Sequence, residues 1–214
     1  SREVHTPLLW AFEGITSYYD DLALKRAGLI SEQEYLETLG QSITRVLRTP
    51  GRFKQSINES SFDAWTKFYK QDENAPNAIA SYYVKGALAA LGLDLTIRAR
   101  TEGRRSLDDV MGALWERHGK PAIGVTEESI EALVDEVTGL SLKPYLDSAL
   151  RGTEDIPLAA LLSPFGIRLN LRAAESASDK GGTPGKEAPL PVSLGIRTAA
   201  DPLVSISDAD GGAT

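Results

Sequence analysis

One carboxylate, Glu13, stands alone in the otherwise uncharged aromatic and apolar segment 10–19. A helix over this segment would bury an apolar stripe, which consists of Leu8, Phe12, Ile15, Tyr19 and Leu22. A charge on the flank of such a stripe is costly unless it is paired or holds a metal ion. Glu13 is therefore a candidate for a structural ion pair or for a metal ligand.

Composition limits the alternatives. The chain has 214 residues, of which 42% are hydrophobic, enough for one sizeable core. Its net charge of -7 argues against a nucleic-acid partner, because no basic stripe is available to displace counterions. No apolar run is long enough to cross a bilayer, so we expect no membrane partner and a cytoplasmic location. There is no cysteine, so any bound metal must use histidine, aspartate or glutamate.

Apolar periodicity predicts a mainly α fold up to about residue 163. A first helix runs toward Gly28, and a capping box of Ser31 and Glu34 begins the second helix, which ends at Pro50. A long helix is predicted from Pro76 to about residue 103. Three shorter helices follow, with predicted N-caps at Ser106, Thr126 and Ser141.

The pattern changes beyond residue 163. Ile167, Leu169 and Leu171 alternate with polar residues, and the run 192–196 is also typical of a strand. A few strands without a helix bury too little apolar surface to stand alone. We therefore expect this tail to lean on the helical body or to begin a truncated β-rich module.

Three motifs together carry a family resemblance. They are WAFEGITSYYDDL at 10–22, ESSFDAW at 59–65 and SYYVKGAL at 81–88. In this order they resemble the downstream half of the catalytic domain of the M61 glycyl aminopeptidases, which are thermolysin-like gluzincin metallopeptidases with a C-terminal PDZ domain. The resemblance implies two parts: 1–163, the helical part of the catalytic domain, and 164–214, a linker and a partial PDZ-like β segment.

The resemblance also implies roles for two residues. Enzymes of this kind hold zinc with two histidines of an H-E-x-x-H helix and with a glutamate of an E-G motif, which matches Glu13. A tyrosine before x-K-G hydrogen-bonds the oxyanion in related aminopeptidases, and it matches Tyr83, with Tyr82 as the competing assignment. A structural carboxylate at Glu13 and a core aromatic at Tyr83 are the plain alternatives.

Two further residues are candidates for a substrate pocket. Glu59 lies in the irregular connection between the second helix and the long helix, and Asn77 lies at its exit. Loops beside a rigid scaffold often carry binding residues. We therefore expect Glu59 and Asn77 to contact a peptide substrate.

The chain departs from the family pattern in its histidines. It contains only His5 and His118, and neither begins an H-E-x-x-H sequence. We therefore expect a fragment of a longer protein, which by itself neither holds catalytic zinc nor cleaves peptides. Its expected partners are a peptide substrate and the remainder of its own catalytic domain. Without that remainder, exposed apolar surface can drive a non-native dimer.

Two functions of different class remain open. The first is part of a zinc aminopeptidase that releases N-terminal glycine or other small residues from peptides. The second is a non-catalytic helical scaffold or interaction module linked to a PDZ-like domain. The enzyme hypothesis requires that Glu13 and Tyr83 converge on one cleft, although 70 positions separate them, as 83 minus 13 shows.

Overall fold

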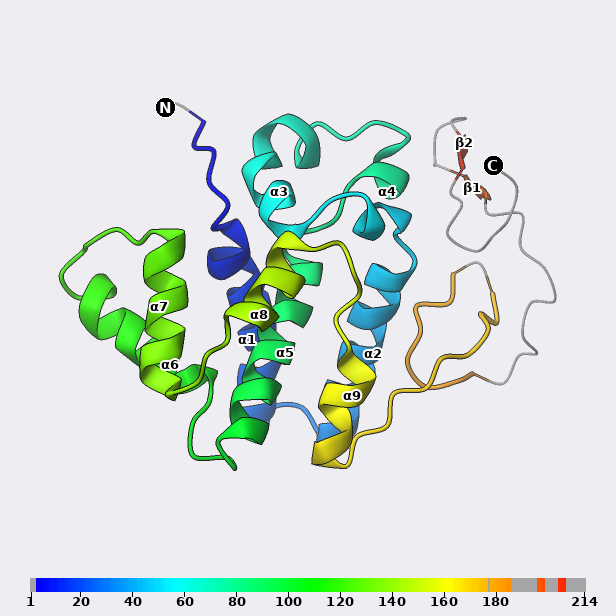
Figure 1. Cartoon of the computed structure of the whole chain (residues 1–214). Coiled ribbons are helices and arrows are strands. Elements are labelled where there is room, and N and C mark those ends of the chain that lie inside the picture. The colour runs from blue at the N-terminus through cyan, green and yellow to red at the C-terminus, as the bar shows by residue number, and fades with distance from the viewer. Residues whose placement is uncertain (1–2, 177, 186–195, 199–203, 207–214) are drawn as a thin grey trace.

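The computed structural model describes residues 3–176, 178–185, 196–198 and 204–206. Its helical body is arranged around α5 (Val84–Arg100), as Figure 1 shows. Helices α1 (Ile15–Arg26), α2 (Glu32–Leu47) and α9 (Leu158–Leu162) pack against α5. The mainly α fold class expected from the sequence is therefore confirmed for this body.

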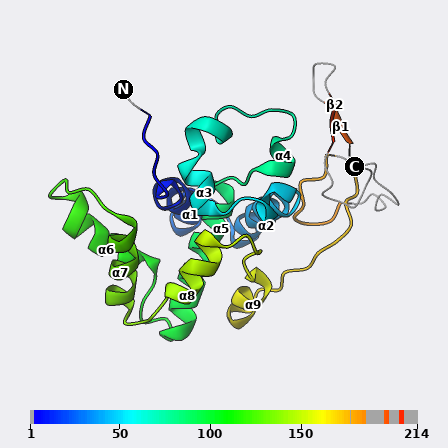
Figure 2. The same ribbon diagram turned by 45° about the horizontal axis from the view of Figure 1, so that its top comes forward.

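Shorter elements complete the body. Helices α6 (Leu107–Leu114) and α7 (Glu127–Thr138) pack on each other at one side, which is clear in Figure 2. The remaining short α-helices are α3 (Ile57–Phe62), α4 (Ala75–Ala78) and α8 (Lys143–Leu146). Single π-helical turns span Trp10–Gly14, Ala64–Phe68, Trp115–Gly119 and Asp147–Arg151, and 3-10 turns span Pro50–Phe53 and Ser163–Phe165.

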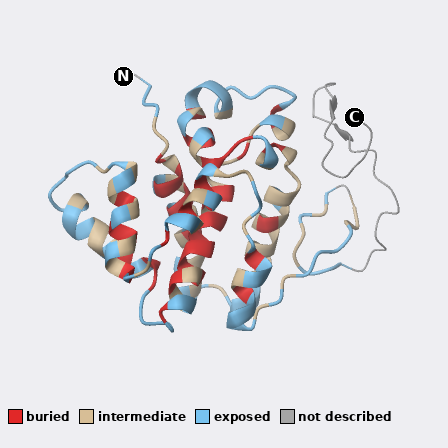
Figure 3. Ribbon diagram, viewed as in Figure 1, coloured by how far each residue is buried: buried red, intermediate tan, exposed pale blue. Residues whose placement is uncertain are grey.

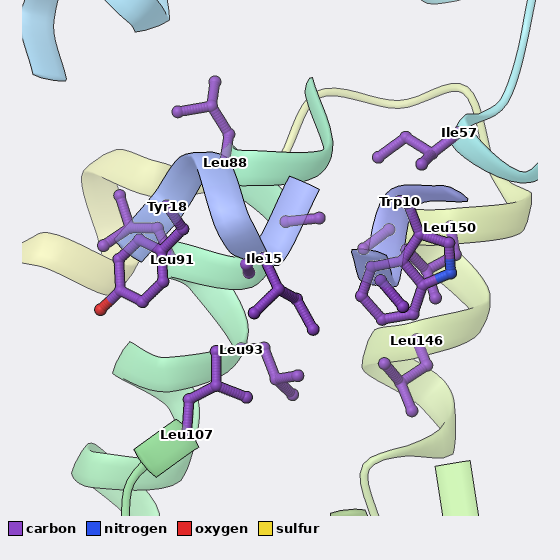
Figure 4. Close-up of a cluster of buried hydrophobic side chains, with 14 of the residues drawn as sticks. Trp10, Ile15, Tyr18, Ile57, Leu88, Leu91, Leu93, Leu107, Leu146 and Leu150 are labelled. Atoms are coloured by element: carbon purple, nitrogen blue, oxygen red, sulfur yellow. The ribbon is translucent and has the colours of Figure 1, made fainter. Parts of the chain in front are cut away.

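Helix α5 forms the centre of the core because its apolar residues cover its whole circumference. Burial is concentrated along α5 and the chain that faces it (Figure 3). Figure 4 shows leucines of α5 between side chains from α1, α6 and the α8 region; the labelled ones are Leu88, Leu91, Leu93, Ile15, Tyr18, Leu107, Leu146 and Leu150. A helix that is apolar on all sides is stable only when neighbours surround it.

Local capping signals are mostly confirmed. Ser31 and Glu34 form the expected capping box, in which the Ser31 backbone N–H donates to the Glu34 carboxylate at 2.8 Å. The predicted cap at Ser141 is wrong, because Leu142 precedes α8. The Leu142 backbone N–H instead donates to the Asp135 carboxylate at 2.9 Å, so a side chain from α7 satisfies the start of this helix.

The long helix predicted from Pro76 to about residue 103 is confirmed as α5 except for its start, which lies eight residues later than expected. Helix α4 ends before Ile79, whose backbone is extended, and α5 begins only at Val84. Buried side chains satisfy the interrupted backbone: Gln55 accepts a hydrogen bond from the Ala80 N–H at 3.0 Å, and the Ser60 hydroxyl donates to the Ala80 carbonyl at 2.6 Å. Tertiary hydrogen bonds therefore replace helical ones here.

The structure does not form the strands predicted at Ile167, Leu169 and Leu171, which lie in irregular chain. Alternation alone cannot make a strand without a partner ladder. Residues 192–195 lie outside the described residues, whereas 196 opens β1 (Ile196–Thr198), which pairs antiparallel with β2 (Val204–Ile206). A PDZ-like module and the division at residue 163 stay predictions. Within the described ranges, no helix combines the length and the apolar character needed to cross a membrane.

A glycine pair sets the distance between the first helical segment and α5. A Cβ built on Gly14 would lie 2.8 Å from the backbone carbon of Gly86, and one on Gly86 would lie 3.2 Å from the Cα of Gly14. A real Cβ essentially never lies as close as 2.8 Å to another heavy atom, and 3.2 Å is tighter than most real Cβ contacts. Glycine at these positions therefore suits the close approach of the two backbones, where the E-G and K-G pairs of the two motifs meet in space.

Replacing Gly14 by alanine should therefore destabilise the fold. The added Cβ must push the two backbones apart, which typically costs about 1–3 kcal/mol of unfolding free energy. Gly112 in α6 is the matched control, because an added Cβ there meets nothing within 4 Å. Gly112→Ala should stabilise the protein by up to about 1 kcal/mol. Urea denaturation measures both; equal stability of Gly14→Ala and the native protein would contradict the close contact.

Candidate functional site

Glu13 lies in the π-helical turn Trp10–Gly14, directly before α1. Such turns are rare and frequently occur at functional sites. The turn is anchored because the Trp10 backbone N–H donates to the buried Ser61 hydroxyl at 3.2 Å. The Glu13 side chain is half-buried, and among the described residues none forms a hydrogen bond or an ion pair with its carboxylate. The structural ion pair considered for Glu13 is therefore not formed by this part of the chain.

Tyr82 and Tyr83 occupy the interrupted stretch before α5. Tyr82 is buried, with 1% of its surface exposed, whereas Tyr83 is half-buried. The Tyr82 hydroxyl donates to the Tyr69 hydroxyl at 3.0 Å, and the Tyr69 and Tyr83 hydroxyls lie 3.4 Å apart. Three phenol groups thus form a chain, of which Tyr83 is one end.

Ring packing holds this chain of hydroxyls in place. The rings of Tyr82 and Tyr83 have centroids 4.7 Å apart, and the Phe68 ring lies 4.9 Å from Tyr82 and 5.9 Å from Tyr83. Tyr69 packs edge-on against Phe68 at 5.5 Å. These separations lie in the range of favourable aromatic pairs, so the orientation of Tyr83 is set by its neighbours.

Electrostatics connect Tyr83 with Glu13. The hydrogen bond to Tyr69 and then burial raise the pKa of Tyr83 to about 12, and the negative charge of Glu13 contributes in the same direction. Burial, followed by the hydrogen bond to Tyr69, raises the pKa of Tyr82 as well. Glu13 directly precedes Gly14, and Tyr83 lies three residues before Gly86, so the two residues flank the same backbone contact. With a pKa of about 12, Tyr83 keeps its proton at neutral pH.

The other predicted site residues have local partners. The Glu59 carboxylate accepts a hydrogen bond from the Ser56 N–H at 2.8 Å, which caps α3. Asn77 in α4 donates from its side-chain amide to the Asn74 side-chain carbonyl at 3.3 Å. The substrate contacts of Glu59 and Asn77 stay predictions.

The two histidines bond to backbone groups. A ring nitrogen of His5 lies 3.0 Å from the Phe62 carbonyl oxygen, and one of His118 lies 3.3 Å from that of Gly124. The described ranges contain no group of three or more histidine, aspartate or glutamate side chains that can hold a metal ion. A catalytic zinc takes three protein ligands, and a single carboxylate such as Glu13 can supply only one of them.

Three residues of the site were missed in the sequence. Phe68 and Tyr69 lie three and four positions after Trp65, which is the spacing of residues on one face of a helix. This aromatic face was the signal in the sequence that could have indicated Phe68 and Tyr69. Lys85 was seen as part of a motif, yet nothing local indicates that its side chain is 2% exposed. Its burial depends on segments far apart in sequence.

Comparison with known proteins shows similarity to one family profile and to solved structures. Residues 1–89 match the sequence profile of the M61 glycyl aminopeptidases. Over 94% of its length the chain is similar to a solved structure, the aminopeptidase N family protein from Idiomarina loihiensis, with 40% sequence identity and a TM-score of 0.89. The chain spans 34% of that protein. A comparison with curated proteins found no match. The resemblance that the three motifs carry is therefore confirmed for residues 1–89 by the profile of the M61 glycyl aminopeptidases.

Removing the Tyr69 hydroxyl should lower the pKa of Tyr83. Tyr69→Phe deletes the hydrogen bond that contributes most to the raised pKa of about 12, so the pKa should fall toward the ordinary tyrosine value. NMR titration of 13C-labelled tyrosine measures it, with the resonance assigned from Tyr83→Phe. Tyr145→Phe is the control, because the Tyr145 hydroxyl donates to the Ala89 carbonyl. An unchanged Tyr83 pKa in Tyr69→Phe would refute the hydroxyl chain.

Proposed function

We propose that this chain is part of a zinc-dependent aminopeptidase, because its residues 1–89 match the profile of the M61 glycyl aminopeptidases. Its substrates are short peptides that begin with glycine or another small residue. One observation supports the proposal most: the Gly14–Gly86 contact brings Glu13 and Tyr83 together from motifs far apart in sequence, with the carboxylate not engaged by the described chain. A peptidase-type function is also what both comparisons support.

Glu13 is proposed as the third protein ligand of the zinc. Its carboxylate is half-buried, which favours binding of a cation over free solvation. The two remaining ligands in the proposal are the histidines of an H-E-x-x-H helix, which this chain does not contain. When bound, zinc polarises the scissile carbonyl and acidifies a water molecule.

Tyr83 is proposed as the donor to the substrate carbonyl oxygen, on which negative charge develops during peptide hydrolysis. A donor aimed at that oxygen stabilises the transition state more than the ground state. The role requires a protonated phenol, in keeping with a pKa of about 12. Because Tyr82 is buried and donates to Tyr69, it is less suited to this role than Tyr83.

The scaffold alternative predicts a different outcome for the same residues. If the chain only packs and binds, substitutions at Glu13 and Tyr83 should leave metal content and turnover of the longer protein unchanged. The cytoplasmic location and the PDZ-like module remain predictions from the sequence.

Substitution of Glu13 should remove zinc. In the full-length enzyme that carries an H-E-x-x-H helix, Glu13→Gln should lose metal, because a neutral amide is a poor zinc ligand. Asp20→Asn, which alters an exposed carboxylate of α1, should keep it. Inductively coupled plasma mass spectrometry gives the zinc content per polypeptide. Full zinc occupancy in Glu13→Gln would rule out Glu13 as a ligand.

Substitution of Tyr83 should slow turnover while zinc is retained. Loss of one oxyanion donor typically lowers kcat by about 10²–10³-fold. Tyr82→Phe is the matched control, since it removes the neighbouring hydroxyl and should have the smaller effect. Hydrolysis of glycine p-nitroanilide gives kcat and KM for both variants. A larger loss in Tyr82→Phe than in Tyr83→Phe would assign the donor to Tyr82.

The 214 residues alone should show neither zinc binding at catalytic affinity nor peptide hydrolysis. Their two histidines bond to backbone carbonyls, and Glu13 is a single ligand. Equilibrium dialysis with zinc and the glycine p-nitroanilide assay measure both properties. Zinc-dependent turnover by this polypeptide would show that a different set of residues forms the site.

A further inference from the structure

A groove of about 760 Å³ opens between α2, α4, the turn Pro50–Phe53 and the start of α5. This volume is sufficient for several residues of a peptide. Phe68 lines the groove and also contacts the ring of Tyr83 at 5.9 Å. The residues that follow Tyr83 continue along its wall, namely Val84 and Lys85. The groove therefore begins next to the candidate active site.

The groove is basic, although the chain as a whole carries a net charge of -7. Its lining contains one acidic residue, Asp179, and five cationic residues. The cationic residues are Arg45, Arg48, Arg52, Lys85 and Lys180. Asp179 is already engaged, because its carboxylate accepts hydrogen bonds from Arg172 and from the Gly181 N–H. Asp155, outside this lining, pairs with Arg52 at 2.9 Å. An excess of positive charge remains.

Lys85 is the most unusual of these cations. Only 2% of its surface is exposed, and its ammonium group donates to the Arg52 carbonyl oxygen at 2.9 Å. An ammonium group has three donors, and burial lowers the pKa of Lys85. A buried cation on the wall of a groove is stabilised by an anion that enters the groove.

We propose that this groove binds carboxylates of an acidic peptide substrate, in the residues that follow the scissile bond. The proposal rests on the proposed aminopeptidase function, and it adds a preference for acidic residues beyond the N-terminal one. Guanidinium groups such as that of Arg45 match the planar geometry of carboxylates. The amide of Gln41 and the hydroxyl of Ser42, both on α2, supply further donors.

Calorimetric titration of the 214-residue chain tests this without zinc or turnover. The probes are the acidic peptide Gly-Ala-Glu-Glu with a free carboxyl terminus and the carboxylate-free peptide Gly-Ala-Gln-Gln amide. The acidic peptide should bind, and salt should weaken its binding because exposed charges are screened. The carboxylate-free peptide should bind at least about tenfold more weakly, since it lacks the three carboxylates of the acidic peptide.

Variants locate the binding site. Arg45 and Lys180 are both exposed, so Arg45→Gln combined with Lys180→Gln should leave the fold intact and weaken binding about three- to tenfold. Lys25→Gln on α1, which removes a charge outside the groove, should leave affinity unchanged. Lys85→Met is a further variant, to be interpreted only if thermal unfolding shows a native-like fold.

Three results would overturn the proposal: no binding of the acidic peptide, equal binding of both peptides, or equal affinity in the double variant and Lys25→Gln. Displacement of the peptide by inorganic phosphate at equal concentration would also overturn it, since the groove would then be a general anion site. Failure of the groove is distinguishable from failure of the enzyme assignment. If the zinc-loaded enzyme cleaves Gly-Ala-Gln-Gln amide with the same kcat/KM as Gly-Ala-Glu-Glu, the aminopeptidase function is retained and the preference of the groove for acidic residues is refuted.

Discussion

The contact between Gly14 and Gly86 is the constraint on which the candidate site depends. Two backbones approach so closely that a Cβ on Gly14 would lie 2.8 Å from the Gly86 backbone. Each glycine adjoins candidate site residues, Glu13 on one side and Tyr83-Val84-Lys85 on the other. Packing at this one point therefore decides the separation of a carboxylate, a phenol and a buried ammonium group.

Irregular backbone on both sides of this contact gives the side chains their directions. Glu13 lies in a π-helical turn, and the helix expected around Tyr83 is interrupted before Val84. Such departures are stable only because buried polar side chains replace the lost helical hydrogen bonds. Gln55, Ser60 and Ser61, all nearly fully buried, supply these bonds. Ser60 and Ser61 belong to the motif at 59–65, which thus holds the backbone of the other two motifs in place.

Local signals in the sequence predicted local structure well. The capping box of Ser31 and Glu34 and the left-handed Gly28 depend on neighbours within a few residues, and both were found. The interruption at Ile79 was missed because Gln55 and Ser60, which satisfy it, lie in another segment. The basic groove was missed for the same reason, since residues from α2, the Pro50–Phe53 turn and α5 meet only in the fold.

The convergence of Glu13 and Tyr83 is the central claim, and the pKa of Tyr83 in Glu13→Gln tests it most directly. Loss of the negative charge should lower this pKa from its value of about 12, as measured by NMR titration at low ionic strength. Asp20→Asn should leave it unchanged, because Asp20 is an exposed carboxylate farther along α1. An identical Tyr83 pKa in the native protein and in Glu13→Gln would show that the two groups do not share one site.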